Sequence, residues 1–91
     1  MRIRVAYRLP ENELGQMMHD SDYYVRTVVA KRITKSMLTL MIHDPDSSVR
    51  MAVAERIDPD MLQAMSGDYD ATVRLAVAKR LPKQRLSMFR Q

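Results

Sequence analysis

The sequence repeats itself at a spacing of 24 residues, and this period constrains the fold more than any other feature. Residues 1–24, 25–48, 49–72 and 73–91 align without gaps. Five columns keep one residue type: Arg2/Arg26/Arg50/Arg74, Val5/Val29/Val53/Val77, Ala6/Ala30/Ala54/Ala78, Arg8/Arg32/Arg56/Arg80 and Leu14/Leu38/Leu62/Leu86. A fixed period of this size is the signature of a solenoid, in which each unit buries its apolar face on its neighbours. We therefore expect residues 1–91 to form one solenoid domain of these units.

Each unit is expected to hold one α-helix and one shorter helix. Asp46 is a strong N-cap, because its carboxylate can accept hydrogen bonds from free N–H groups of the first turn. Apolar residues then recur at helical spacing from Val49 to Ile57, and Pro59 prevents the helix from continuing. The next segment carries Leu62 and Met65, enough for one or two turns, a length typical of a 3₁₀ helix. A unit of this length cannot hold two helices of about 11 residues and their turns.

A β-strand is the alternative for the apolar part of each unit. Residues 73–81 also alternate between apolar and other positions, and leucine-rich repeats of similar length place a strand there. The alanine column and the repeated aspartate cap favour a helix instead. The leucine-x-leucine core followed by asparagine is also missing. The sequence therefore predicts an all-α solenoid.

The pattern Asp-x-x-Val-Arg-x-Ala-Val-Ala-x-Arg, followed by a Leu-x-x-Met segment, resembles the leucine-rich repeat variant family. It is seen at Asp46, Val49, Arg50, Ala52, Val53, Ala54 and Arg56 and recurs over the whole chain. The resemblance implies a right-handed superhelix of alternating α- and 3₁₀-helices. A more distant resemblance is to the second helix of HEAT-type repeats, where Asp and Arg often form a ladder between units. The founding type of this family looks like a two-part protein, in which a cysteine-rich segment that holds an iron–sulfur cluster precedes the repeats. This chain has no cysteine, so the resemblance implies no iron–sulfur cluster here.

Composition excludes several classes of function. Without cysteine the chain has no disulfides, thiolate metal sites or cysteine nucleophiles. The first 20 residues carry several charges and no long apolar run, so we expect no signal peptide or membrane span and a cytoplasmic protein. There is no nucleophile–base pair and no Gly-rich phosphate loop, and capping explains the Asp-x-Asp turns better than metal binding. We expect no enzyme activity, no cofactor and no metal, including at His19 and His43.

The two arginine columns differ in their surroundings. Arg26, Arg50 and Arg74 each follow an aspartate by four residues, and an arginine can also bridge to a carboxylate of the next unit. We therefore interpret this column as an inter-repeat ladder. The second column has no acidic residue at a fixed nearby position, and Lys31 and Lys79 adjoin it. We call Arg8, Arg32, Arg56 and Arg80 the arginine row.

The arginine row, together with Lys31 and Lys79, is the predicted partner-binding site. The chain has 15 basic and 11 acidic residues and a net charge of +4, which favours acidic partners. The leading hypothesis is a non-enzymatic module that binds an acidic protein surface through its curved face. The alternative is sequence-independent binding of nucleic acid, with the row following a phosphate backbone.

Two further expectations concern the ends of the array and the tyrosines. Stable arrays normally have polar capping units. Here the first unit lacks its Asp-cap turn, and the last unit shows no unusual polarity at its apolar columns, so a homo-oligomer or an end-on partner is expected. Tyr23, Tyr24 and Tyr69 lie in the turns before helices, where we expect them to pack partly under those turns.

Overall fold

Long and short helices alternate along the chain, as the period predicts. The structure is a computed structural model and describes residues 2–81. The first helix of each unit is α1 (Arg2–Arg8), α2 (Tyr23–Arg32), α3 (Ser47–Arg56) or α5 (Ala71–Arg80); because α2, α3 and α5 have 10 residues each, we call these four the long helices. The short ones are η1 (Glu11–Met17), η2 (Lys35–Met41), and α4 (Pro59–Leu62), which continues as η3 (Gln63–Met65). These residues contain no strand, which confirms the all-α prediction.

An aspartate begins each of the helices α2, α3 and α5. The carboxylates of Asp22, Asp46 and Asp70 accept hydrogen bonds from backbone N–H groups of the first turn, at 2.9, 2.8 and 2.8 Å. The preceding aspartate of each turn accepts from the backbone N–H of the capping residue; for Asp44 this distance is 2.9 Å. The Asp-x-Asp motif therefore closes the turn and starts the helix, so capping accounts for it.

The short helices are mainly 3₁₀ helices, as the spacing of their apolar residues predicts. In the third unit the segment starts with one α-helical turn, α4, in which Pro59 stands at the first helical position. Proline suits this position because its missing N–H would have no partner inside the helix. The equivalent segment of the fourth unit, with Leu86 and Phe89, lies outside the described residues.

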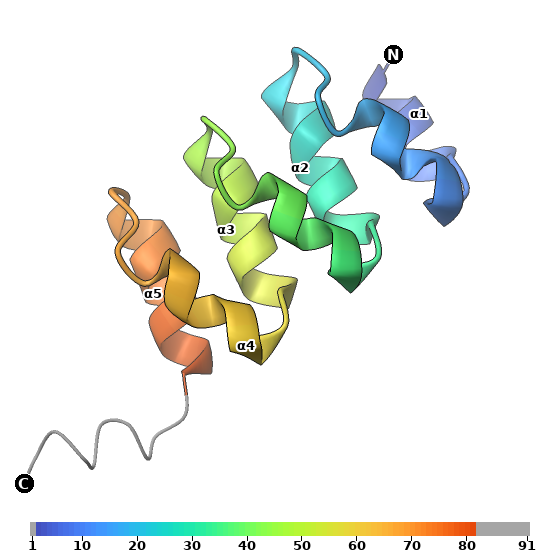
Figure 1. Cartoon of the computed structure of the whole chain (residues 1–91). Helices are drawn as coiled ribbons and strands as arrows, with labels where there is room; N and C mark the ends of the chain where they lie inside the picture. The colour runs from blue at the N-terminus through green and yellow to red at the C-terminus, as the bar shows by residue number, and fades with distance from the viewer. Residues whose placement is uncertain (1, 82–91) are drawn as a thin grey trace, which may run out of the picture.

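The long helices lie side by side in a row, with the short helices along one side of it (Figure 1). Helix α1 packs on α2, α2 on α3, and α3 on α5. Leu14, Leu38 and Leu62 of the short helices are at most 1% exposed and join the same core. The core is therefore a stripe that runs along the row, with a smaller cluster between α1 and α2.

The alanine column lets neighbouring long helices approach closely. Ala6, Ala30 and Ala54 are fully buried, because each faces the next helix of the row. Ala78 occupies the same position on α5 and is exposed. The valine column shows the reverse, since Val5 of α1 is 46% exposed while Val77 is only 1% exposed. Alanines thus face the following unit and valines face the preceding one.

The described array is elongated. Its dimensions are 52 × 23 × 16 Å and its Cα radius of gyration is 14.2 Å. A compact domain of this length would have a radius of gyration of about 12 Å. None of the helices between residues 2 and 81 is both long enough and apolar enough to cross a membrane.

Candidate interaction surface

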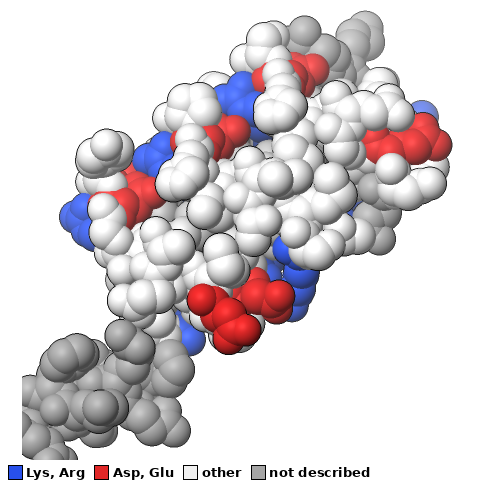
Figure 2. All heavy atoms as spheres, viewed as in Figure 1, with Lys and Arg blue, Asp and Glu red and all other residues white. Residues whose placement is uncertain are grey.

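The first arginine column forms a ladder along the edge where the Asp-x-Asp turns lie. Arg26 binds Asp44 through Nε and Nη2, at 2.9 and 3.3 Å, and Arg50 binds Asp68 at 2.8 and 3.2 Å. Nη1 of Arg50 also donates to the backbone oxygen of Asp44, at 2.7 Å. Basic and acidic side chains therefore alternate along this edge (Figure 2). The predicted inter-repeat ladder is confirmed at these two positions.

The carboxylate partner in the ladder lies 18 residues downstream of its arginine. Arg50 thus pairs with Asp68, and not with Asp46 four residues upstream, because Asp46 caps α3. Each arginine joins the turn before its own helix to the turn before the next helix. Since the side chains of Arg50 and Asp68 are only 12% and 9% exposed, the pair is shielded from solvent. The ladder is therefore a structural element.

The ladder changes the ionisation of its members. Partial burial alone would raise the pKa of Asp68, but hydrogen bonds from Arg50 and from the backbone N–H of Asp70 together lower that pKa below its usual value. The hydrogen bond to Asp68 raises the pKa of Arg50, which therefore stays charged. Hydrogen bonds from Thr72 lower the pKa of Asp70, the cap of α5.

Three members of the arginine row also donate hydrogen bonds inside the fold. Their acceptors are backbone carbonyl oxygens of the preceding unit, which the neighbouring sequence does not indicate. Nη1 of Arg32 donates to the carbonyl oxygen of Ala6 at 2.6 Å, and Nη1 of Arg56 donates to that of Ala30 at 2.8 Å. Arg80 reaches the carbonyl oxygen of Ala54 at 3.0 Å and that of Ile57 at 2.7 Å. These oxygens lie at the C-terminal ends of the preceding helices, where a cation stabilises the helix dipole. The three half-buried arginines therefore link successive units.

The remaining predicted site residues are exposed. Arg8 has no helix before it in the described chain, and there it makes no hydrogen bond or ion pair. Lys31 and Lys79 lie at the C-terminal ends of α2 and α5, with their side chains in solvent. Sequence reasoning thus placed all six residues along one edge, but three of them have a structural contact as well.

Acidic residues of the third unit interrupt this edge. Lys31 and Lys35 make the second unit basic there, whereas Glu55, Asp58 and Asp60 are exposed at the corresponding end of α3 and the start of α4. The fourth unit is basic again because of Lys79 and Arg80. Along this edge, the second unit is therefore basic, the third acidic and the fourth basic again.

A groove of about 350 Å³ lies between α3 and α5 on the side of the long helices. Met51, Leu75 and Ala76 line it with apolar side chains, and Lys79 and Arg80 bring positive charge to it. Glu55 and Thr72 complete the lining. The groove thus brings two of the predicted site residues next to apolar side chains.

Sequence reasoning missed the apolar residues of this face. Leu75 is 55% exposed, and Tyr7 and Tyr24 of the earlier units are 59% and 57% exposed. Tyr24 occupies the place of Thr72, which lines the groove, and Tyr7 occupies the place of Lys79. These columns vary in residue type from unit to unit, so a search for repeated types passes over them. Exposure alone reveals them.

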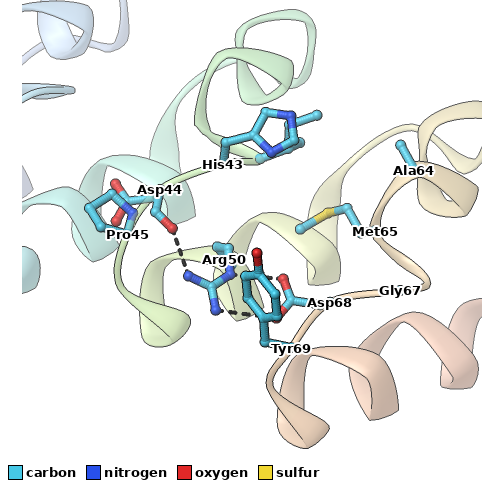
Figure 3. Close-up of a pocket in the computed structure, with 10 residues that line it drawn as sticks. His43, Asp44, Pro45, Arg50, Ala64, Met65, Gly67, Asp68 and Tyr69 are labelled. Atoms are coloured by element: carbon cyan, nitrogen blue, oxygen red, sulfur yellow. Dashed lines mark hydrogen bonds and ion pairs between the residues drawn. The ribbon is translucent and has the colours of Figure 1, made fainter.

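A second depression, of about 440 Å³, lies on the opposite edge between the turns that precede α3 and α5 (Figure 3). Arg50 lies at its centre and is held by Asp44 and Asp68, so its charge is already compensated. Tyr69 stands beside it and is 98% exposed. The expectation that Tyr69 packs under its turn is therefore wrong, because its ring lies almost entirely in solvent. Within residues 2–81 no three His, Asp or Glu side chains converge as a metal site would require.

The helical units, their continuous core and their inter-unit arginines define a helical-repeat solenoid. A solved structure described as "a leucine-rich repeat variant with a novel repetitive protein structural motif" matches the chain with a TM-score of 0.90 and 44% sequence identity. The match covers 96% of this chain and 37% of that structure, so the chain spans little more than a third of its length. The chain is built from repeats of the leucine-rich repeat variant type, as the sequence predicts. No protein-family model and no curated protein matches the sequence.

Proposed function

We propose that the chain is a non-enzymatic interaction module that binds an acidic, partly apolar segment of a protein on the face of its long helices. The fold supports this role in general terms, since helical-repeat arrays present extended surfaces to partners. The observation that carries the specific proposal is the groove between α3 and α5, where Met51 and Leu75 adjoin Lys79 and Arg80. An apolar centre with charged residues at its rim is the usual composition of a protein interface.

The contacts of the arginine row decide how its members contribute. Arg32, Arg56 and Arg80 each use Nη1 to hold a backbone oxygen, so their positive ends are fixed in place along the edge. Lys31 and Lys79 carry the mobile positive charge at the same edge. A fixed guanidinium loses little conformational entropy when a carboxylate binds to it. In this proposal the lysines attract the partner and the arginines orient it.

The alternation of charge favours a protein over a nucleic acid as the partner. A phosphate backbone carries uniform negative charge and would meet Glu55, Asp58 and Asp60 in the middle of the edge. A protein segment can place a basic residue opposite that block. We therefore propose a partner that is acidic at its two ends and neutral or basic between them. Residence in the cytoplasm stays a prediction.

The test is a pair of binding titrations at low and at physiological salt. One uses a labelled acidic peptide that contains leucine, and the other uses a labelled single-stranded oligonucleotide. The variant Lys31→Ser/Lys79→Ser should weaken binding of the peptide, because it removes the mobile positive charge of the edge. The matched control is Glu13→Ser, which changes an exposed charge on the short helix η1 but keeps both lysines and the acidic block of the edge, and it should not weaken binding.

Binding of the peptide that the lysine variant does not reduce would contradict the proposed site. Binding of the oligonucleotide in preference to the peptide, with a steep dependence on salt, would replace the proposal by nucleic-acid binding. Because Lys31 and Lys79 are exposed, their removal should leave the unfolding midpoint unchanged, and a thermal melt verifies this.

A further inference from the structure

The surface between α1 and α2 carries two exposed tyrosines at positions that line the groove elsewhere in the array. The groove between α3 and α5 has Glu55 on one helix and Thr72, Lys79 and Arg80 on the other. Two units earlier, the same positions are held by Tyr7 on α1 and by Tyr24, Lys31 and Arg32 on α2. We call these last four residues the aromatic patch.

The aromatic patch is exposed because of where its residues stand within the unit. Tyr7 is 59% exposed, and Tyr24, on a helix packed between α1 and α3, is 57% exposed. The position of Tyr7 is also exposed in α2 and α3, where Lys31 and Glu55 hold it and a long helix packs on each side. A further unit packed against α1 would therefore leave Tyr7 as exposed as α1 leaves Lys31.

Two members of the aromatic patch are held in place before any partner binds. The ring of Tyr24 stacks on the ring of Tyr23, with centroids 4.5 Å apart and an angle of 26° between the planes. Nη1 of Arg32 donates to the carbonyl oxygen of Ala6, the residue next to Tyr7, at 2.6 Å. Side chains that are already ordered lose little conformational entropy on binding. Tyrosine and arginine are also the residues on which binding energy concentrates in protein interfaces.

The junction between α2 and α3 separates the aromatic patch from the groove and has a different chemistry. Ser48 and Glu55 stand there at the positions of Tyr24 and Lys31. The surface along the row is thus aromatic and basic, then acidic, then apolar and basic. Neighbouring helices pack about 8–10 Å apart, so the patch and the groove are about 16–20 Å apart. An extended or polyproline II segment covers this distance in about five or six residues.

From this arrangement we infer that the acidic segment crosses the row in an extended conformation, with a proline on Tyr7 and Tyr24 and its leucine in the groove between α3 and α5. Proline packs on aromatic side chains and keeps a segment extended. An acidic residue beside the proline faces Lys31 and Arg32, and a neutral or basic residue midway faces Glu55. The inference rests on the proposed function and adds the proline and its spacing from the leucine.

The experiment measures binding of labelled peptides to the full chain by fluorescence anisotropy. The reference peptide is acidic at both ends, has a lysine at its centre, and carries a proline and a leucine at the spacing given above. It is made with the two residues in either order, and the order that binds more tightly is used. One variant peptide replaces the proline by serine, and another halves the spacing.

The protein variant is Tyr7→Ser/Tyr24→Ser. The matched control is Tyr69→Ser, which removes a tyrosine that is 98% exposed on the turn edge, where the Asp-x-Asp turns lie. Because all three tyrosines are exposed, both variants should keep the unfolding midpoint of the wild type, and a thermal melt verifies this. The peptide without proline tests the same contact with the unchanged protein.

Removal of both patch tyrosines should weaken binding of the reference peptide about tenfold or more, as is usual for the aromatic anchors of an interface. The peptide without proline should lose the same factor on the wild type. It should lose nothing further on the tyrosine variant, because both changes remove one contact. The peptide with half the spacing should bind like the peptide without proline, and Tyr69→Ser should bind like the wild type.

Three results would overturn the inference, and they differ in what else they affect. Binding that Leu75→Ser weakens, but that the tyrosine variant and both variant peptides leave unchanged, would overturn it and leave the proposed function standing. No binding of the reference peptide, or binding that Lys31→Ser/Lys79→Ser leaves unchanged, would overturn the proposed function and this inference with it. A single-stranded oligonucleotide that binds more tightly than the peptide, and only with both tyrosines present, would assign the patch to base stacking instead.

Discussion

Residues that occupy the same column of the repeat contribute unequally to the stability of the fold, because their contacts differ. Arg50 and Arg74 are equivalent in sequence, but only Arg50 binds a carboxylate among the described residues. Arg50→Ala removes the guanidinium donor from the backbone oxygen of Asp44 and leaves Asp68 with the backbone N–H of Asp70 as its donor, which should lower the free energy of unfolding by about 1–3 kcal/mol. Arg74→Ala should cost less than about 1 kcal/mol, because Arg74 is exposed. Urea unfolding of both variants measures the difference, and equal losses would contradict the ladder as described.

The lowered pKa of Asp68 makes a prediction about acid stability. A carboxylate whose pKa is lower in the folded chain than in the unfolded chain stabilises the fold above the unfolded value of about 3.9. That contribution is lost as the pH falls through the lower, folded pKa. Between a pH of about 6 and a pH of about 3, the wild type should therefore lose more stability than Asp68→Asn does.

Urea midpoints at several pH values test this prediction. Asp58→Asn is the control, because the side chain of Asp58 makes no capping hydrogen bond. It should keep the pH dependence of the wild type. A pH dependence of Asp68→Asn that equals that of the wild type would show that Asp68 does not contribute.

At the scale of helices, the arginine row joins each long helix to the end of the preceding one. Arg56 holds the carbonyl oxygen of Ala30 in the last turn of α2, whereas Arg8 makes no such contact in the described chain. Arg56→Ala should therefore lower the free energy of unfolding by about 1–3 kcal/mol, and Arg8→Ala should leave it nearly unchanged. Both are measured by urea unfolding at a concentration where the chain is monomeric. If Arg56→Ala were as stable as the wild type, the row would have no structural role.

The alanine column gives a second prediction for helix packing. Ala54 is fully buried between α3 and α5, while Ala78 is exposed on α5. Ala54→Leu should destabilise the chain by about 1–3 kcal/mol, because added methylenes force packed helices apart. Ala78→Leu should change stability by at most about 0.5 kcal/mol, as is usual for surface substitutions. Thermal melts of the two variants compare them, and a tolerated Ala54→Leu would contradict the close approach of the helices.

The elements could be predicted from the sequence because the signals that define them are local. Asp46 stands directly before its helix, and Pro59 stands shortly after its end, so cap, helix and stop follow from neighbouring residues. The contacts between units could be predicted only in part. Asp46 lies four residues before Arg50 and looks like its partner, but it is used as a cap, and Asp68 takes its place.

Arg56 binds the backbone carbonyl oxygen of Ala30. Because every residue has such an oxygen, no sequence pattern identifies Ala30 as the partner. The groove on the long-helix face was also not predictable from repeated columns. Met51 and Leu75 differ in type although they occupy one column, and Thr27 is their counterpart in the second unit. Their common property is their position on the face, which only the folded arrangement gives.

On the scale of the whole molecule, the array separates its structural contacts from its open surface. Along the edge where the Asp-x-Asp turns lie, the ladder links each turn to the next. Along the opposite edge, the arginine row links each long helix to the preceding one. The face of the long helices keeps exposed apolar and basic side chains, including Leu75 and Lys79. This face is therefore where we place the proposed binding of an acidic, partly apolar segment.

Mapping backbone amide shifts by NMR, while the acidic leucine-containing peptide is added, tests this placement most directly. Shifts should cluster at the groove, around Met51, Leu75 and Lys79, and Leu75→Ser should reduce them. The amides of Asp44, Asp68 and Tyr69 on the turn edge should not move. Shifts that cluster at the turn edge, or a saturating response that Leu75→Ser leaves unchanged, would contradict the account.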